Sequence, residues 1–182
     1  MMVSPVVWSM WICPSTPLVK SSAPLLPVKV KALFLPTEAW ASIRALFAAT
    51  PLARERGYTP GTFSFNSGDG RCPACSGSGF EHVEMQFLSD VYLRCPECDG
   101  KRFRTEVLEV RLASEHSIAD VLALTVDEAL LAFAGEAEVV RALTPLVEVG
   151  LGYLALGQPV PTLSGGESQR LKLAGHIAEA TG

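Results

Sequence analysis

Four of the five cysteines lie in one short stretch of the chain and form two pairs with the same spacing. Two residues separate the thiols of each pair, and nineteen residues separate the pairs. A CxxC turn presents two sulfurs on one side, so two such turns can surround one ion. Four thiolates suit Zn²⁺, and a closed set of four ligands leaves no position for water, which predicts a structural zinc site. Its expected ligands are Cys72, Cys75, Cys95 and Cys98.

Three glycines that follow these turns fit the same interpretation. Gly77 and Gly79 come after the first pair, and Gly100 comes after the second. Glycine lets the backbone turn tightly, so that its amides can donate hydrogen bonds to the sulfurs. Four buried or free thiols are the alternative, and a redox CxxC would need only one pair. The pattern favours a metal and a reducing, cytoplasmic compartment, with Cys13 left over.

Basic and aromatic side chains surround the second cysteine pair. On a rigid zinc module, basic side chains can contact DNA phosphates and an aromatic ring can stack on a base. The alternative is a solvated face with an aromatic residue in the core. The candidate DNA contacts are Lys101, Arg102 and Arg104, and their neighbours are Arg94, Tyr92 and Phe103.

The stretch LGQPVPTLSGGESQRLKLA, residues 156–174, contains a second constellation. Ser164 and Glu167 have the spacing of a capping box ahead of a helix. Two glycines occupy the first turn, where backbone amides have no helical partner and the helix dipole favours an anion. From the residues alone, this is either a capped helix start or a phosphate site.

Several elements must position these two sites. Ile43, Leu46 and Phe47 predict a helix over residues 40–50. Alternation on either side of residues 88–90 predicts two short strands joined by a turn, and alternation over 108–112 predicts another strand. Two later helices are expected to begin at Ser117 and at the Thr125–Glu128 capping box. A third, which contains Pro145, is expected to end near Gly150.

Composition indicates a folded globular chain of 182 residues, 48% hydrophobic and 19% charged, with a net charge of −4. This charge gives no global attraction to nucleic acid. Residues 1–36 contain no acidic residue and six prolines, so we expect a poorly ordered segment and no membrane helix there. The remaining regions are a helix and turn-rich lead-in (37–69), the zinc module (70–105) and a region with the LSGG motif (106–182).

LSGGESQR resembles the signature motif of ABC-type ATPases. In that family the motif closes over the γ-phosphate of a nucleotide bound to a Walker A loop on an opposing domain. The resemblance implies that Ser164, Gly165 and Gly166 contact ATP in trans, with Gln169 in the helix of the motif. Gln158 falls where these ATPases carry a short loop before the signature.

Three further stretches, taken with the cysteine module, limit the resemblance to one family within the ABC-type ATPases. They are RGYTPGTFSFN, RCPACSGSGF and VEMQFLSDVYLRCPECDGKRF. From residue 40 onward the chain resembles the C-terminal half of the UvrA family, which belongs to the excinuclease ABC system of bacterial nucleotide excision repair. The resemblance implies Zn²⁺, ATP with Mg²⁺ in a complete composite site, damaged double-stranded DNA, a UvrB-like partner, and an opposing ATPase half or a second copy. It implies no membrane.

The chain departs from this family in three respects. It has no Walker A sequence GxxxxGK[ST], it stops at HIAEATG before a Walker B strand, and residues 1–36 do not resemble the family. We therefore expect a fragment, from a truncated or frameshifted reading frame, that does not hydrolyse ATP by itself. The expected fold is α+β, with a zinc-binding β-hairpin module attached to a partial helical portion of an ABC ATPase domain lacking Walker A and Walker B.

Three other interpretations remain open at this point. CPACSGSG fits the CxxCxGxG repeat of DnaJ-like zinc chaperone modules, although that family has four repeats, two are present here, and LSGGESQR stays unexplained. A stand-alone zinc DNA-binding protein would bind duplex without nucleotide and in a salt-dependent way. An inactive truncated product would bind neither unfolded chains nor duplex DNA.

Overall fold

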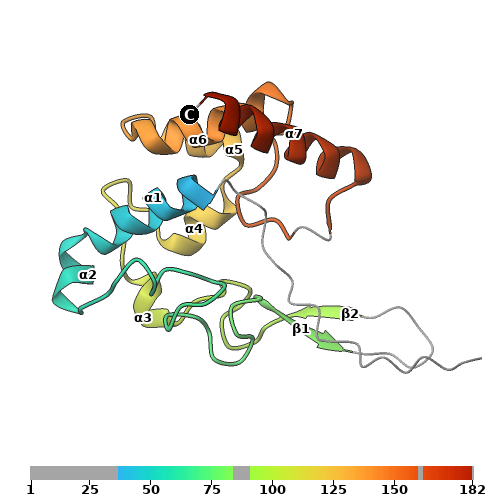
Figure 1. Ribbon diagram of the computed structural model, residues 1–182. Helices are drawn as coiled ribbons and strands as arrows, with labels where there is room; N and C mark the ends of the chain where they lie inside the picture. The colour runs from blue at the N-terminus through green and yellow to red at the C-terminus, as the bar shows by residue number, and fades with distance from the viewer. Residues whose placement is uncertain (1–36, 84–90, 160–161, 182) are drawn as a thin grey trace, which may run out of the picture.

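A computed structural model describes residues 37–83, 91–159 and 162–181. A body of helices carries one projecting two-stranded antiparallel hairpin (Figure 1), in agreement with the α+β prediction. The expected poorly ordered segment, residues 1–36, lies outside the described residues. The elements are α1 (Thr37–Ala48), α2 (Pro51–Glu55), β1 (Phe80–Val83), β2 (Val91–Arg94), α3 (Thr105–Leu108), α4 (Ile118–Ala123), α5 (Val126–Ala132), α6 (Ala137–Glu148) and α7 (Gly165–Thr181).

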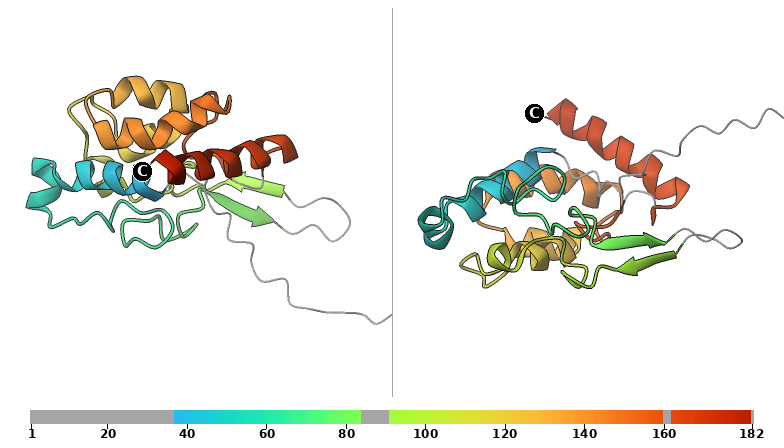
Figure 2. Two further views of the ribbon diagram at one scale, coloured as in Figure 1. Left: turned by 45° about the horizontal axis from the view of Figure 1, so that its top comes forward. Right: turned by 90° about the horizontal axis from the view of Figure 1, so that it is seen from below.

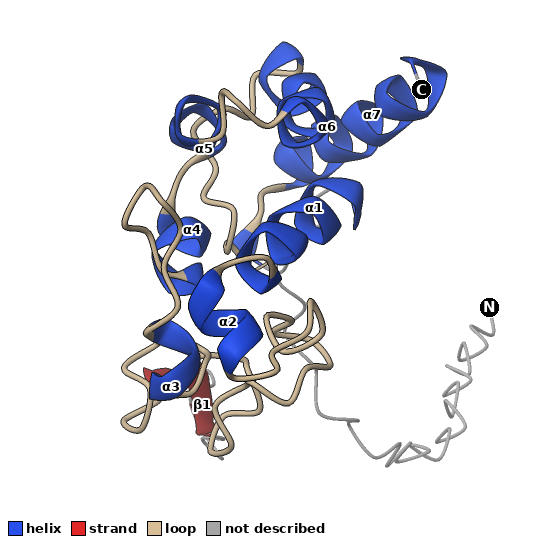
Figure 3. Ribbon diagram, turned by 90° about the vertical axis from the view of Figure 1, so that its left-hand side faces the viewer, coloured by secondary structure: helices blue, strands red, loops and turns tan. Residues whose placement is uncertain are grey.

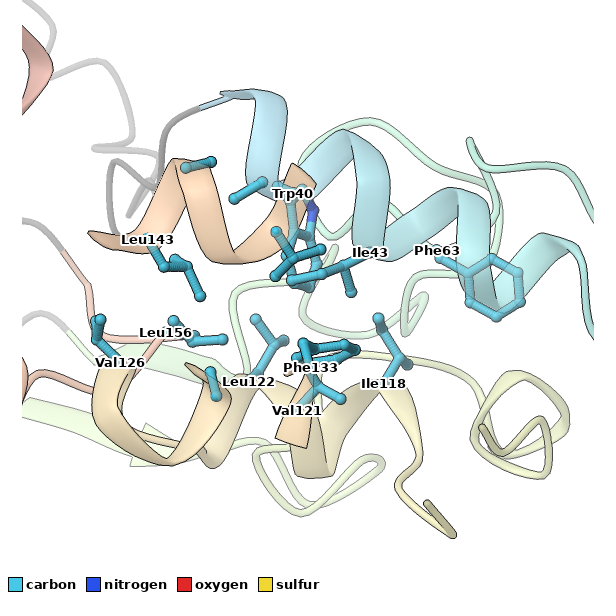
Figure 4. Packing of buried hydrophobic residues seen from close by; sticks show 14 of the residues in the cluster. Trp40, Ile43, Phe63, Ile118, Val121, Leu122, Val126, Phe133, Leu143 and Leu156 are labelled. Carbon is cyan, nitrogen blue, oxygen red and sulfur yellow. The ribbon is translucent and has the colours of Figure 1, made fainter. Parts of the chain in front are cut away.

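Helix α1 lies against α6, which also contacts α5 and α7 (Figure 3). The predicted apolar face of α1 is confirmed, because Ile43 and Phe47 are fully buried and Leu46 packs partly buried against the core. Figure 4 shows Ile43 and Trp40 directed into an interior that Phe133 enters from the opposite side. Truncating a buried phenylalanine such as Phe47 to alanine typically costs about 3–5 kcal/mol.

Local capping chemistry sets the starts of the later helices, as predicted. The Ser117 hydroxyl accepts a hydrogen bond from the Asp120 amide, and the Asp120 carboxylate accepts one from the Ser117 amide at 2.8 Å. Thr125 and Glu128 form the same capping box ahead of α5. Each box satisfies amides that have no carbonyl partner inside the helix.

The end of α6 is also confirmed. The helix stops at Glu148, and Gly150 follows in the left-handed region with φ of +74°. Pro145 lies inside α6 and is buried. Glycine adopts this backbone conformation without the steric cost of a Cβ atom, which explains why it marks the helix end.

The predicted strand over residues 108–112 is wrong. The chain forms the helical turn α3 up to Leu108 instead. Val107 and Val110 are both buried, and the Val110 amide donates to the Val107 carbonyl at 3.2 Å, so a turn separates them. Beyond this turn, Arg111 makes an isolated antiparallel bridge to Ser117 that does not extend into a strand.

The lead-in after α2 packs two aromatic residues against α1. The Phe63 ring lies 5.3 Å from the Phe47 ring, and the Phe65 ring lies 5.4 Å from the Trp40 ring. These contacts connect the helical body to the start of the cysteine module. In Figure 2, α7 and the hairpin both extend toward the same side of the body. Of the helices in the described part of the chain, none is long and apolar enough to cross a membrane.

Candidate metal centre and exposed helix tip

The four thiols predicted to bind zinc converge on one point. Their sulfurs all lie within 4.8 Å of one another, with 4.0 Å between Cys72 and Cys95 and 3.7 Å between Cys75 and Cys98. A tetrahedron with Zn–S bonds of about 2.3 Å places its sulfurs about 3.8 Å apart. No disulfide joins these four thiols. The cluster therefore has the size and the donor set that a structural zinc ion requires.

Two antiparallel pairings hold the cysteine turns together. Directly beside the β1–β2 pairing, the Cys95 amide donates to the Gly79 carbonyl at 3.0 Å. The second predicted strand is confirmed by β2, whereas Met85 and Phe87 of the first lie outside the described residues. On the other side of the cluster, the Cys72 amide donates to the Arg102 carbonyl at 2.8 Å. The residues that join the two strands, 84–90, lie outside the described part. The first turn thus precedes the hairpin, the second follows it, and the pairings bring them face to face.

The glycines behind the turns adopt the backbone conformation expected of them. All three have positive φ, from +76° to +86°. The Gly79 amide donates to the Cys75 sulfur at 3.3 Å, as predicted for a glycine amide. At the second turn, however, the donor to the Cys98 sulfur is the Arg102 amide at 3.4 Å. The three glycines are Gly77, Gly79 and Gly100.

Burial and hydrogen bonding act in opposite directions on the pKa values of three of the thiols. Burial raises the pKa of Cys72, and it raises the pKa of Cys98 to about 12. Burial also acts to raise the pKa of Cys75, but hydrogen bonds, first from the Gly79 amide, outweigh it and the pKa of Cys75 is lowered. Without a cation, Cys72 and Cys98 therefore hold their protons at neutral pH. A bound Zn²⁺ would displace these protons.

The three basic residues predicted to contact DNA lie in different environments. Lys101 and Arg104 are exposed, and Nε of Arg104 donates to the Arg71 carbonyl at 3.3 Å. Arg102 is only 8% exposed, and its guanidinium donates to the Gly157 carbonyl at 2.7 Å. Burial lowers the pKa of Arg102. The partner of Arg102 is far along the chain, so no signal in the sequence around the second cysteine pair distinguishes it from its exposed neighbours.

The neighbours of these basic residues also divide between surface and interior. Tyr92 is 53% exposed on β2, whereas Phe103 is 1% exposed and belongs to the core. Arg94 lies 3.8 Å from the Asp99 carboxylate, and both side chains are largely exposed. An ion pair in such a position contributes little to stability. Among the described residues of the module, exposed cations therefore accompany the exposed ring of Tyr92.

Helix α7 begins directly after Ser164 with the predicted capping box. The Ser164 hydroxyl accepts from the Glu167 amide at 3.3 Å, and the Glu167 carboxylate accepts from the Ser164 amide at 2.7 Å. The Tyr153 hydroxyl also donates to the Glu167 carboxylate. These bonds lower the pKa of Glu167, and the bond from Tyr153 has the largest effect. The first turn of α7 is thereby fixed to the segment that follows α6.

The tip of α7 is open. Gly165 and Gly166 are exposed, and a Cβ atom added to either would meet no heavy atom within 4 Å. Gln169 is exposed one turn further along the helix, and Nε2 of the Gln158 side chain donates to the Thr162 hydroxyl at 3.3 Å. Amides in the first turn of a helix carry the positive end of its dipole. This geometry can accept a phosphate group from another molecule.

Comparison with known proteins finds close relatives for most of the chain, although no protein-family model matches it. The chain is 57% identical to UvrABC system protein A of Thermus thermophilus over 141 residues, which are 77% of this chain and 15% of that protein. It is 54% identical to UvrABC system protein A of Synechocystis sp. over 142 residues, which are 78% of this chain and 14% of that protein.

A solved structure agrees with these relatives. The crystal structure of UvrA2 from Deinococcus radiodurans matches with a TM-score of 0.74 and 56% sequence identity, over 78% of this chain and 17% of that chain. The chain thus spans about one seventh of the length of the curated relatives it matches.

Proposed function

We propose that this chain, which belongs to the UvrABC system protein A family, is part of a DNA-damage-recognition ATPase of nucleotide excision repair. In this proposal it contributes a zinc module for DNA contact and a signature helix for ATP contact in trans. The observation that carries the proposal is that one segment, 57% identical to its Thermus thermophilus relative, combines a compact four-thiol cluster with an open LSGG helix tip.

The zinc ion has a structural role in this proposal. Cys72, Cys75, Cys95 and Cys98 would hold it, and bound Zn²⁺ would supply four strong cross-links within a small module. Three of the four sulfurs come from buried residues, so little space remains for a water or a substrate. The amides of Gly79 and Arg102 stabilise the thiolate form of the sulfurs they contact.

The signature helix completes a nucleotide site that another polypeptide begins. Phosphoryl transfer needs a phosphate cradle, Mg²⁺ ligands and a positioned water. Ser164, Gly165, Gly166 and Gln169 would add one contact to the γ-phosphate of ATP, whose Mg²⁺ is held by an opposing ATPase half or a second copy. The chain by itself is expected not to hydrolyse ATP, because none of its residues supplies the Walker A loop.

In this proposal the exposed cations of the module contact DNA. Lys101 and Arg104 can reach phosphates from outside, whereas Arg102, predicted with them, supports this surface from the interior. Damaged duplex would be distinguished by shape and deformability more than by base edges. A UvrB-like protein is the expected partner after damage has been found.

The test is nucleotide-dependent association. The purified chain is mixed with a UvrA-family ATPase half that carries intact Walker A and Walker B motifs, and co-elution is measured with ATP analogues, with ADP and without nucleotide. Co-elution is expected only with a γ-phosphate mimic. Gly166→Ala is expected to abolish it without lowering the melting temperature, because the added methyl group meets no neighbour in the chain.

A matched control is Gly135→Ala, another open glycine, which lies outside the signature. It should leave association unchanged. Turnover of ATP by the isolated chain, or association that ignores the nucleotide, would contradict the proposal. Metal analysis of the same preparation is expected to give one zinc ion per chain.

A further inference from the structure

The backbone of Arg102 contacts both cysteine turns. Its amide donates to the Cys98 sulfur at 3.4 Å, and its carbonyl accepts from the Cys72 amide at 2.8 Å. Arg102 also has φ of +71°, in the left-handed region that residues with a Cβ atom rarely adopt. The two contacts hold it there. Its backbone conformation therefore depends on the arrangement of the four sulfurs.

The side chain of Arg102 leaves the module and enters the helical body. It is 8% exposed, its guanidinium lies 5.7 Å from the centre of the Phe65 ring, and its terminal nitrogen donates to the Gly157 carbonyl at 2.7 Å. The Phe65 ring in turn packs on Trp40 of α1. A single residue thus connects the metal centre with two other parts of the chain.

Gly157 belongs to the segment that leads to the signature helix. Its amide donates to the Leu122 carbonyl at 2.7 Å, and Gln158 follows directly. Arg102 and Gly157 both line a cavity of about 430 Å³ between the module and α4. The Gln158 backbone amide donates to the Ala155 carbonyl at 3.0 Å, so the peptide group between Gly157 and Gln158 is held through its amide by Ala155 and through its carbonyl by Arg102.

We propose that Arg102 is a positioning residue that makes the conformation of the segment at Gly157–Gln158 depend on metal at the four-cysteine site. A metal fixes the sulfurs, the sulfurs fix the Arg102 backbone, and the Arg102 guanidinium fixes the peptide group between Gly157 and Gln158. The inference goes beyond the proposed function, since it concerns contacts within the chain and holds whether or not α7 meets ATP.

The test follows the Gly157–Gln158 peptide group by NMR in the full chain. In the wild type, removal of zinc is expected to shift the Gly157 carbonyl carbon and the Gln158 amide. In zinc-loaded Arg102→Ala, both signals are expected to lie already at shifted positions, while Co²⁺ substitution still gives the thiolate absorption bands of a four-cysteine site. Arg102→Lys keeps a cation with N–H donors and is expected to restore part of the wild-type shift.

Zinc affinity supplies an independent measurement, because coupling between metal binding and the Gly157–Gln158 segment must act in both directions. If metal fixes the segment through Arg102, loss of the side chain must weaken metal binding, and Arg102→Ala is expected to lower zinc affinity about 10-fold. The matched control is Arg141→Ala, an exposed arginine on α6, which should change neither the affinity nor the Gln158 backbone amide.

Two results would overturn the proposal. One is a Gly157 carbonyl signal that is the same in zinc-loaded wild type and zinc-loaded Arg102→Ala. The other, which needs no variant, is a wild-type Gln158 amide that stays in place while the cysteine signals report loss of zinc.

Discussion

The Glu167 carboxylate receives hydrogen bonds from both the Ser164 amide and the Tyr153 hydroxyl. The first bond closes the capping box of α7, and the second ties the helix tip to the segment after α6. Glu128 offers a direct comparison, because it closes the same kind of box on Thr125, and the hydrogen bonds from Thr125 alone lower its pKa. Comparing Glu167 with Glu128 therefore separates the effect of the tyrosine on the glutamate pKa from the effect of the capping box.

Tyr153→Phe is expected to raise the pKa of Glu167 toward its ordinary value, because the hydrogen bond from Tyr153 is the largest cause of its lowering. A lowered folded-state pKa means that the cap is fully present above the ordinary pKa of about 4.3 and is lost as pH falls through the folded value. In the variant this loss is expected to begin at higher pH. The measurement is an NMR titration of the two glutamate carboxyl carbons. A Glu128 titration that moves equally would contradict this account.

Chelation of zinc is expected to loosen the zinc module, residues 70–105, and to leave α1 and α6 protected. The module has a small interior of its own that consists of the cysteines, whereas α1 and α6 share the large apolar core. Hydrogen exchange measured before and after chelation tests this. Cys95→Ser is expected to reproduce the chelated state, and Cys13→Ser to behave like the wild type. Equal loss of protection in α1 would show that the helical body also depends on the metal.

Zinc uptake is expected to release protons at neutral pH. Burial raises the pKa values of Cys72 and Cys98, so these thiols are protonated without metal and must lose their protons to bind it. Zinc affinity should therefore rise with pH and fall as the solution becomes more acidic. Titration of the metal-free chain with Zn²⁺ in weak buffer measures the released protons directly. Uptake without proton release would mean that the thiols are already ionised.

Gly77→Ala is expected to destabilise the module, at about 1–3 kcal/mol or more. Gly77 has φ of +86°, and a Cβ atom there would lie 2.3 Å from the Phe65 carbonyl oxygen. Gly57→Ala is the matched control, because Gly57 has φ of +67° but open space around it. The control is expected to lose only the free energy of unfolding that a Cβ atom costs at positive φ. Chemical denaturation of the zinc-loaded variants compares them, and equal losses would exclude crowding at Gly77.

The features that could be predicted from the sequence are those set by neighbouring residues. The caps at Ser117, Thr125 and Ser164 depend on side chains three positions apart, and the structure contains all three. The cysteine turns are equally local, and the fixed geometry of thiolate ligation indicated that the two turns must meet. A short chemical pattern was sufficient in each of these cases.

The features that were missed depend on tertiary contacts. Alternation of apolar residues around Val110 suggested a strand, but residues 105–108 form a helical turn and Arg111 makes only an isolated bridge, to Ser117. In the sequence, Arg102 resembles its exposed neighbours Lys101 and Arg104, and only its contact with Gly157 reveals an internal role. Propensity and spacing carry no information about a partner 55 residues away.

The cysteine module leaves the helical body and returns to it through hydrogen-bonded neighbours. The Arg104 amide donates to the Gly70 carbonyl at 2.9 Å, and Arg71 is bridged to Phe103. A segment whose two ends meet can be inserted into a chain at a small entropic cost and without rerouting the remainder. Grafted between two adjacent strand positions of an unrelated scaffold, the module would bring its own ligands and turns, but the scaffold would have to bury Arg102 and Phe103, as the helical body does here.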